Sequence, residues 1–160
     1  MKNIILFFII ILLTTSLHAN EKNKWSFSVG QFDINDNIDS FETRFEYLYG
    51  RSFYQNRFDL KQFLGVMSNS DDAIYLYSGL RKEIQISKKW NFTPSFAFGY
   101  YDRGNSKDLG HNLEFRSQIE FSYQIGLNRI GFNLNHISNA SIGDTNPGTE
   151  SATVSLIRSF

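Results

Sequence analysis

LEFRSQIEFSYQ, residues 113–124, is the stretch that decides the fold class of this chain. Apolar and polar side chains alternate along it, which is the period-two pattern of a β-strand. One face is apolar, and the other carries two Glu, one Arg and two Gln. In a soluble sandwich the apolar face packs into the core, whereas in a membrane barrel it faces lipid and the polar face fills the lumen.

The length of such runs distinguishes these two interpretations. About eight alternating runs follow residue 19, and several reach roughly 10 to 13 residues, which is long for a soluble strand but suits a tilted transmembrane one. Backbone groups cannot stay unpaired in hydrocarbon, so such strands must close into a barrel. We therefore predict an all-β fold, an eight-stranded antiparallel transmembrane β-barrel of the bacterial outer membrane. The alternative is a small secreted sandwich or a lipocalin-like barrel.

The N-terminus has the features of a secretory signal. Lys2 precedes an unbroken apolar run from Ile4 to Leu13, which is too short to span a bilayer as a helix, and cleavage is expected after Ala19. Residues 1–19 are then removed, and residues 20–160 form a single domain. Because the mature N-terminus starts in the periplasm, outer loops are expected near residues 33–41, 67–72, 101–112 and 139–149. Inner turns are expected near residues 50–57, 87–89 and 126–129.

Charge and cysteine content exclude several classes of function. Lys2 is the one basic residue of 16 that leaves with the signal, so the mature chain keeps its 16 acidic residues and has a net charge of −1. Without a basic excess, nucleic acid is not expected as a partner. There is no Cys, and only His111 and His136 remain after cleavage, so we expect neither a metal site nor a cofactor.

Residues 130–160 carry the candidate chemistry. Two alternating runs flank a polar loop at residues 139–149, which is a hairpin signal. His136 and Ser138 continue the apolar face of the first run, about 6.7 Å apart in Cα position, and Glu150 starts the same face of the second run. These are the parts of an activated hydroxyl: Ser138 as nucleophile, His136 as general base, and Glu150 holding the tautomer and charge of the imidazole.

The location of these residues admits two explanations. They lie at the outer end of the barrel and point toward the membrane, where polar side chains are costly. A substrate that itself resides in the outer leaflet would explain them. Alternatively, they lie at the depth of the lipid headgroups, where polar residues are tolerated and no chemistry is implied.

A resemblance favours the first explanation. The segment His136-Ile137-Ser138-Asn139-Ala140, followed by Asn146-Pro147-Gly148 and then Glu150, resembles the motif of the outer-membrane lipid A 3-O-deacylases, the PagL family. A terminal strand ending in Phe160 likewise resembles the end signal of bacterial outer-membrane barrels. The resemblance implies an eight-stranded barrel whose Ser-His-Glu triad faces lipid. It also implies hydrolysis of the ester that links a 3-hydroxyacyl chain to the 3-position of lipid A.

The resemblance also implies roles for the loop and the identity of the partner. Asn139 and Asn146 would shape the oxyanion hole and the loop, and Ser141, where the family tends to have Gly, would still offer a backbone N–H. Lipopolysaccharide would be the substrate, and Arg103 and Lys107 in an outer loop could meet its phosphates. A homodimer stays open as an assembly. The rival functions are a non-enzymatic barrel, structural or adhesive, and an outer-membrane phospholipase or acyltransferase.

Overall fold

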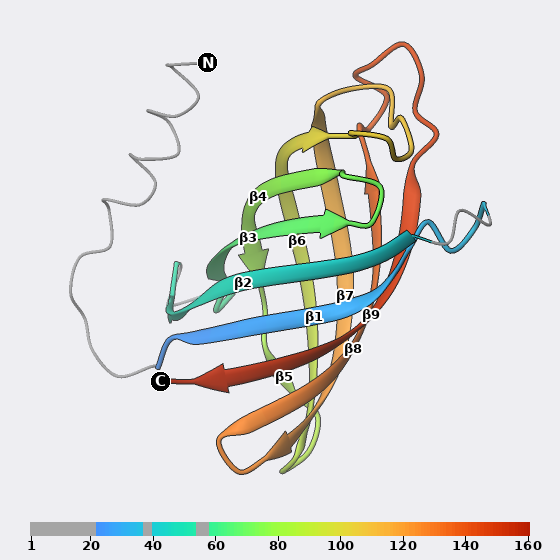
Figure 1. Ribbon diagram of the computed structural model, residues 1–160. Coiled ribbons are helices and arrows are strands. Elements are labelled where there is room, and N and C mark those ends of the chain that lie inside the picture. Colours follow the sequence, from blue (N-terminus) through green and yellow to red (C-terminus); the bar gives the residue numbers. More distant parts are fainter. Residues whose placement is uncertain (1–21, 37–39, 54–57) are drawn as a thin grey trace.

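The described residues form one antiparallel β-sheet that closes on itself (Figure 1). The computed structural model describes residues 22–36, 40–53 and 58–160. The predicted signal peptide, residues 1–19, lies outside them. No helix in the described part of the chain is long and apolar enough to cross a membrane.

The wall of the barrel has eight strand positions, each of which is called a stave. The strands of the described residues are β1 (Lys24–Phe32), β2 (Ser40–Ser52), β3 (Lys61–Asn69), β4 (Ile74–Arg81), β5 (Ile84–Gln85), β6 (Trp90–Asp102), β7 (Leu113–Ile125), β8 (Asn128–Ser138) and β9 (Thr149–Ser159). The two-residue β5 continues the path of β4, because both pair with β6. β4 and β5 therefore count as one stave, which confirms the predicted number.

The first and last strands close the sheet. β1 pairs with β9 along its whole length, from Lys24 opposite Ser159 to Phe32 opposite Ser151. β4 pairs with β6 elsewhere around the barrel, which joins the two ends of the strand order. Every stave therefore has a hydrogen-bonded neighbour on both sides, which removes the open edges that hydrocarbon does not tolerate.

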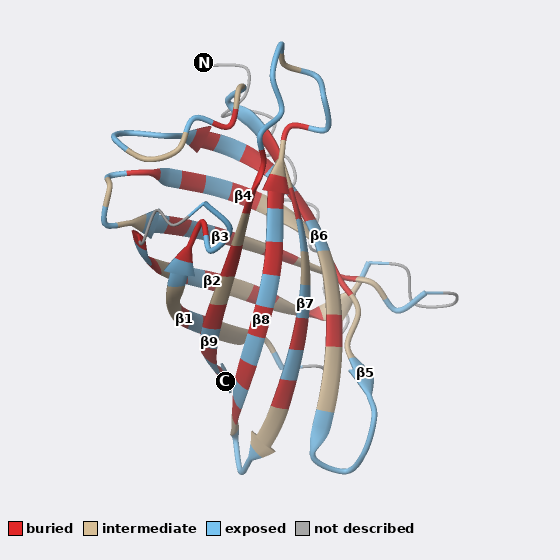
Figure 2. Ribbon diagram, turned by 90° about the vertical axis from the view of Figure 1, so that its right-hand side faces the viewer, coloured by how far each residue is buried: buried red, intermediate tan, exposed pale blue. Residues whose placement is uncertain are grey.

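Burial alternates along the strands in the sense expected of a membrane barrel. Figure 2 shows the resulting bands of buried and exposed residues along β7 and β8. The outward side chains are large and apolar: Phe96 is 54% exposed, Phe121 44% and Phe132 49%. The inward side chains of Glu114 and Arg116 are 0% and 1% exposed. This confirms the interpretation of residues 113–124, because a soluble sandwich would bury the aromatic face instead.

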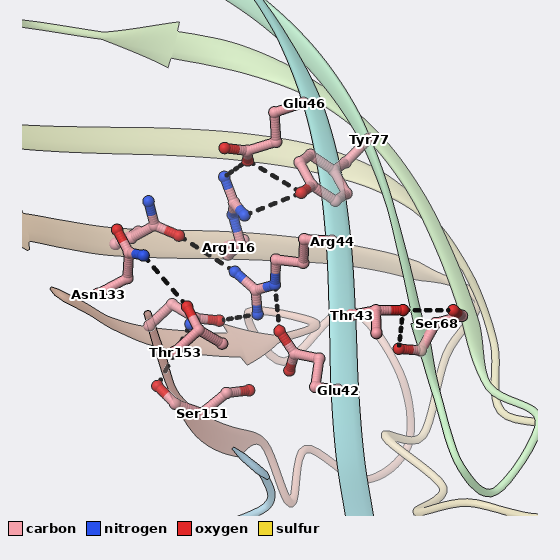
Figure 3. Close-up of polar contacts among 12 residues, drawn as sticks. Glu42, Thr43, Arg44, Glu46, Ser68, Tyr77, Arg116, Asn133, Ser151 and Thr153 are labelled. Atoms are coloured by element: carbon pink, nitrogen blue, oxygen red, sulfur yellow. Dashed lines mark hydrogen bonds and ion pairs between the residues drawn. The ribbon is translucent and has the colours of Figure 1, made fainter. Parts of the chain in front are cut away.

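Paired polar side chains fill the lumen (Figure 3). Arg116 donates to Glu46 Oε1 at 2.8 Å and to the Tyr77 hydroxyl at 3.1 Å, and its guanidinium lies 4.3 Å from the centre of the Tyr77 ring. Buried charges are tolerated only with such partners. An eight-stranded barrel is narrow enough for side chains to fill, and this interior matches that size.

Candidate active site

His136 and Glu150 face each other across two neighbouring strands at one end of the barrel. They are register partners in the pairing of β8 with β9. His136 Nδ1 lies 2.8 Å from Glu150 Oε1, and the two side chains are 46% and 37% exposed on the outer face. A carboxylate at Nδ1 favours the tautomer that carries its proton there and leaves a lone pair on Nε2. That second nitrogen is the one available to a hydroxyl.

Ser138 is the last residue of β8, two positions beyond His136 on the same face, and it is half-buried. Two strand rises separate the Cα atoms of Ser138 and His136 by about 6.7 Å. Among the described residues, no hydrogen bond joins the Ser138 hydroxyl to the His136 ring. The fold thus brings His136 and Glu150 into contact and leaves Ser138 beside them on the same strand. Catalytic hydrogen bonds are often long before substrate binds.

Asn139 anchors the loop that follows Ser138. Its side chain is fully buried, and its amide nitrogen donates to the carbonyl oxygens of Leu109 at 2.8 Å and Thr145 at 2.7 Å. Its backbone N–H donates to Asn146 Oδ1 at 3.0 Å. Asn139 therefore links the β8–β9 loop to the β6–β7 loop, and Asn146 holds the backbone of Asn139. Both side chains fix the shape of the loop.

The chain turns sharply directly after Asn139. Ala140 and Ser141 have φ values of 53° and 62°, in the left-handed region that non-glycine residues seldom adopt. Asn146 Nδ2 donates to Ser141 Oγ at 3.5 Å. Within the described residues, the backbone N–H groups of Ala140 and Ser141 donate to no protein acceptor. Two successive strained residues beside a candidate nucleophile are typical of functional sites.

Gly148 lies against the imidazole of His136. Its φ is +64°, and a Cβ built on it would come within 3.0 Å of His136 Cε1. The returning loop can pass over the ring only because this position has no side chain. The motif contained Gly148, but periodicity alone could only identify it as a turn residue.

The β1–β2 loop supplies contacts to Glu150 that the sequence did not reveal. Asn35 Nδ2 donates to Glu150 Oε2, and the N–H of Ile34 donates to the Glu150 carbonyl oxygen at 3.1 Å. Asn35 and Glu150 are 115 positions apart in the chain. One signal could have suggested this neighbour: in a closed barrel the first strand pairs with the last, so the loop after β1 must leave the sheet beside the start of β9.

A buried aspartate ties this loop to the rest of the site. Asp33 is fully buried with a φ of 58°, and its Oδ1 accepts hydrogen bonds from Thr149 Oγ1 at 2.9 Å and from Lys107 Nζ at 2.8 Å. Lys107 also pairs with Asp36. Burial alone would lower the pKa of the Lys107 ammonium, but the two carboxylates raise that pKa above its usual value.

The remaining charged and metal-binding candidates of the outer loops are engaged with protein groups. Arg103 pairs with Asp108 at 2.8 Å. Like Lys107, it thus already has a carboxylate partner, which weakens its case as a phosphate ligand. His111 Nδ1 accepts the N–H of Leu113 at 2.9 Å. In the described part of the chain, no group of three or more His, Cys, Asp or Glu could hold a metal ion.

A groove opens on the outer face beside His136. Ser117 on β7 is the register partner of His136, and its small side chain interrupts a row of Phe, Ile and Tyr on that face. The groove reaches from Glu150 past Ser117 toward β6, and its apolar lining consists of Ile34, Pro94, Ile119 and Leu134. An apolar trough that ends at an imidazole and a carboxylate suits a substrate with a hydrocarbon chain beside a polar linkage.

Solved structures with the same architecture include a natural enzyme and a designed barrel. The crystal structure of the outer membrane enzyme PagL superposes with a TM-score of 0.63 and 16% identity, covering 84% of this chain and 98% of that one. A de novo designed transmembrane β-barrel gives 0.62 and 11% identity, with 91% and 100% covered. The Yersinia pestis outer membrane protein Ail, in a phospholipid bilayer nanodisc, gives 0.53 and 10% identity, with 88% and 100% covered. These identities show the fold alone.

The sequence itself identifies the family. The profile described as "Lipid A 3-O-deacylase (PagL)" matches residues 24–157, which is nearly the whole of the barrel. No curated protein matches the sequence. The profile and the barrel architecture agree with the resemblance carried by His136, Ser138 and Glu150, and they place the protein in the outer membrane. The chain belongs to the PagL family of outer-membrane lipid A deacylases.

Proposed function

We propose that this protein is a serine esterase that hydrolyses the ester of the 3-hydroxyacyl chain at the 3-position of lipid A. Membership of the family supports deacylation of lipid A. The observation that carries the finer assignment is the 2.8 Å contact between His136 Nδ1 and Glu150 Oε1, two residues from a serine on the same outward face. No metal or cofactor enters the reaction.

In the first step, Ser138 Oγ attacks the carbonyl carbon of the ester. His136 Nε2 accepts the hydroxyl proton, and the carboxylate of Glu150 stabilises the resulting imidazolium through Nδ1. The tetrahedral intermediate collapses as the bond to the sugar oxygen breaks, and His136 returns its proton to that oxygen. The products are lipid A with a free 3-hydroxyl group and an acyl group esterified to Ser138.

In the second step, water replaces the sugar oxygen. His136 Nε2 takes a proton from the water as it attacks the acyl carbonyl, and the same proton then returns to Ser138 Oγ. The released product is a 3-hydroxy fatty acid. One imidazole serves both steps, which is why its orientation toward Ser138 must be maintained throughout.

The loop after Ser138 supplies the candidate donors for the oxyanion. The N–H of Asn139 is already occupied by Asn146 Oδ1 at 3.0 Å. The N–H groups of Ala140 and Ser141 are therefore better candidates, since the left-handed turn at φ 53° and 62° presents successive amides near Ser138. Donors within about 3 Å of the developing charge commonly contribute 10²–10³-fold in kcat. Asn139 and Asn146 then act by holding the turn.

The location on the outer wall suits a substrate that never leaves the membrane. Lipid A resides in the outer leaflet, so a site that faces lipid at the loop end meets the ester directly. The apolar trough lined by Ile119 and Leu134 would receive the acyl chain. On the lipid face of a barrel, an Arg or Lys costs about 0–1 kcal/mol near the interface, compared with about 2–4 at the midplane, and Asp or Glu costs less. A polar site at the loop end of the barrel is therefore tolerated.

Mass spectrometry of lipid A from cells that express the protein tests this assignment. Expression of the wild type should remove one 3-hydroxyacyl unit from lipid A, whereas Ser138→Ala should leave lipid A unchanged. Ser68→Ala is the matched control, because Ser68 is also a serine on the outer face but lies on β3. This control should behave as the wild type does, and heat-modifiable migration in gels would verify folding of all three.

Three outcomes would contradict the proposal. Unchanged lipid A with a folded wild-type barrel would favour a non-enzymatic role. Loss of acyl chains from phospholipid, or addition of palmitate to lipid A, would instead favour the phospholipase or acyltransferase. Full activity of Ser138→Ala would exclude Ser138 as the nucleophile.

A further inference from the structure

We propose that Asn35, in the loop between β1 and β2, is a positioning residue that holds the carboxylate of Glu150 in register with His136. The inference rests on the proposed function, in which Glu150 orients the imidazole, and it adds a fourth residue from the opposite end of the chain. Asn35 acts through Glu150 and does not line the groove beside His136.

Three polar atoms of Glu150 each have a separate partner. Oε1 lies 2.8 Å from His136 Nδ1, and Oε2 accepts a hydrogen bond from the side-chain amide of Asn35. The carbonyl oxygen of Glu150 accepts a hydrogen bond from the N–H of Ile34 at 3.1 Å. A carboxylate held by one oxygen can still rotate about its last side-chain bonds, whereas one held by both oxygens has a fixed plane. The fixed plane in turn fixes the direction in which His136 Nε2 points.

The loop that carries Asn35 is itself anchored beside Glu150. The pairing of Phe32 with Ser151 delivers the chain from β1 next to the start of β9. Buried Asp33 then accepts hydrogen bonds from Thr149, the residue before Glu150, and from Lys107 of the β6–β7 loop. The amide of Asn35 is thus held beside β9, because the two preceding residues, Asp33 and Ile34, are hydrogen-bonded to Thr149 and Glu150.

This support is needed because Glu150 lies at an exposed position. Its side chain is 37% exposed and the side chain of His136 is 46% exposed, so packing alone does not hold either group. In other Ser-His-acid sites the acid is commonly buried, which restricts its motion. Here the amide of Asn35, on the far side of the carboxylate from His136, restricts the motion of Glu150 instead. Hydrogen bonds to charged groups are stronger than neutral ones, so loss of this donor should be measurable.

The test measures lipid A deacylation by purified, folded protein in detergent micelles. Asn35→Ala should lower kcat about tenfold and leave KM within about twofold, because the amide touches Glu150 and not the groove. Asn35→Gln keeps a side-chain amide at this position and should recover at least about half of the lost rate. In a Glu150→Ala background, Asn35→Ala should cause no further loss beyond about twofold, since its effect passes through Glu150.

Asn105→Ala is the matched control. Asn105 Nδ2 donates to Asp72 Oδ2 at 3.0 Å, so this variant also breaks an amide–carboxylate bond between two outer loops, but the carboxylate is that of Asp72 and not that of Glu150. It should retain the wild-type kcat. Equal losses in Asn35→Ala and Asn105→Ala would indicate general loosening of the loops and would overturn the inference.

Further results separate this inference from the function on which it rests. An active wild type with full activity in Asn35→Ala would refute the positioning role alone. A further tenfold loss in the Glu150→Ala background would do the same, because Asn35 would then act independently of Glu150. A folded wild type that leaves lipid A intact would refute both proposals together.

Discussion

Substitution of Gly148 by Ala tests whether the orientation of His136 limits the rate. Gly148 has φ +64°, and an added Cβ would come 3.0 Å from His136 Cε1 and 3.6 Å from Nε2. An Ala in this conformation costs about 1 kcal/mol of stability. The contact with Cε1 is tighter than ordinary packing, so the ring or the loop must shift by a few tenths of an ångström.

The shift has a predictable effect on catalysis. The ring is attached to Glu150 through the 2.8 Å contact at Nδ1, so pressure on Cε1 rotates the ring and redirects Nε2 away from Ser138. Misplacement of a catalytic group by about 1 Å can cost about 10²-fold in rate, so a shift of a few tenths should cost about tenfold in kcat. Binding of lipid A should change little, because Gly148 does not line the groove.

Gly126→Ala provides the control for backbone strain. Gly126 has φ +59°, almost the same as Gly148, but a Cβ there would meet nothing within 4 Å. It lies in the β7–β8 turn at the end of the barrel away from His136. Both variants should therefore lose about 1 kcal/mol of stability in urea-induced unfolding in detergent, and only Gly148→Ala should lose activity.

Two results would refute this reasoning. If Gly148→Ala deacylates lipid A at the wild-type rate, the contact with His136 Cε1 does not constrain the ring. If Gly126→Ala loses as much activity as Gly148→Ala, the loss reflects stability and not the imidazole.

The remaining predictions concern the barrel that supports the site. Arg116→Ala leaves Glu46 buried without its guanidinium and should cost about 3–5 kcal/mol in urea-induced unfolding, whereas Arg103→Ala, which breaks an exposed pair, should cost no more than about 1 kcal/mol. Ser141→Gly should raise stability by about 0.5–1 kcal/mol in the same assay, because Ser141 has φ 62°; lower stability would contradict this.

Alternation made the wall of the barrel predictable from the sequence. Each residue of residues 113–124 faces either lipid or lumen, so the period-two pattern encodes both the strand and the side of the wall on which each residue lies. Hydrocarbon forbids open edges, so the number of runs then gave the number of staves. The break at Lys82 and Glu83 was not predictable, because the apolar alternation continues across it from Leu80 to Ile84 and Ile86.

The alternating pattern predicted only part of the candidate site. His136 and Glu150 flank one hairpin loop, so strand pairing brings them together, and their contact follows from local sequence. Asn35 and Lys107 reach the site from other loops, and their approach depends on closure of the barrel and on loop conformations without periodicity. Sequence patterns describe strands, whereas long-range polar contacts between loops follow from the three-dimensional arrangement.

The inward and outward faces of β8 and β9 have different roles: the inward side chains hold the two strands in place, and the outward side chains form the candidate site. Behind His136, the inward side chain of Asn135 accepts a hydrogen bond from Arg44 and donates to the carbonyl oxygen of Ser151, the residue after Glu150. The lumenal network thus ties together the backbones that carry the imidazole and the carboxylate. A paired polar interior can therefore hold the proposed catalytic pair on a surface that faces lipid, where no surrounding protein packs against it. The proposed chemistry on the outer wall depends on this interior as much as on the residues that would meet the substrate.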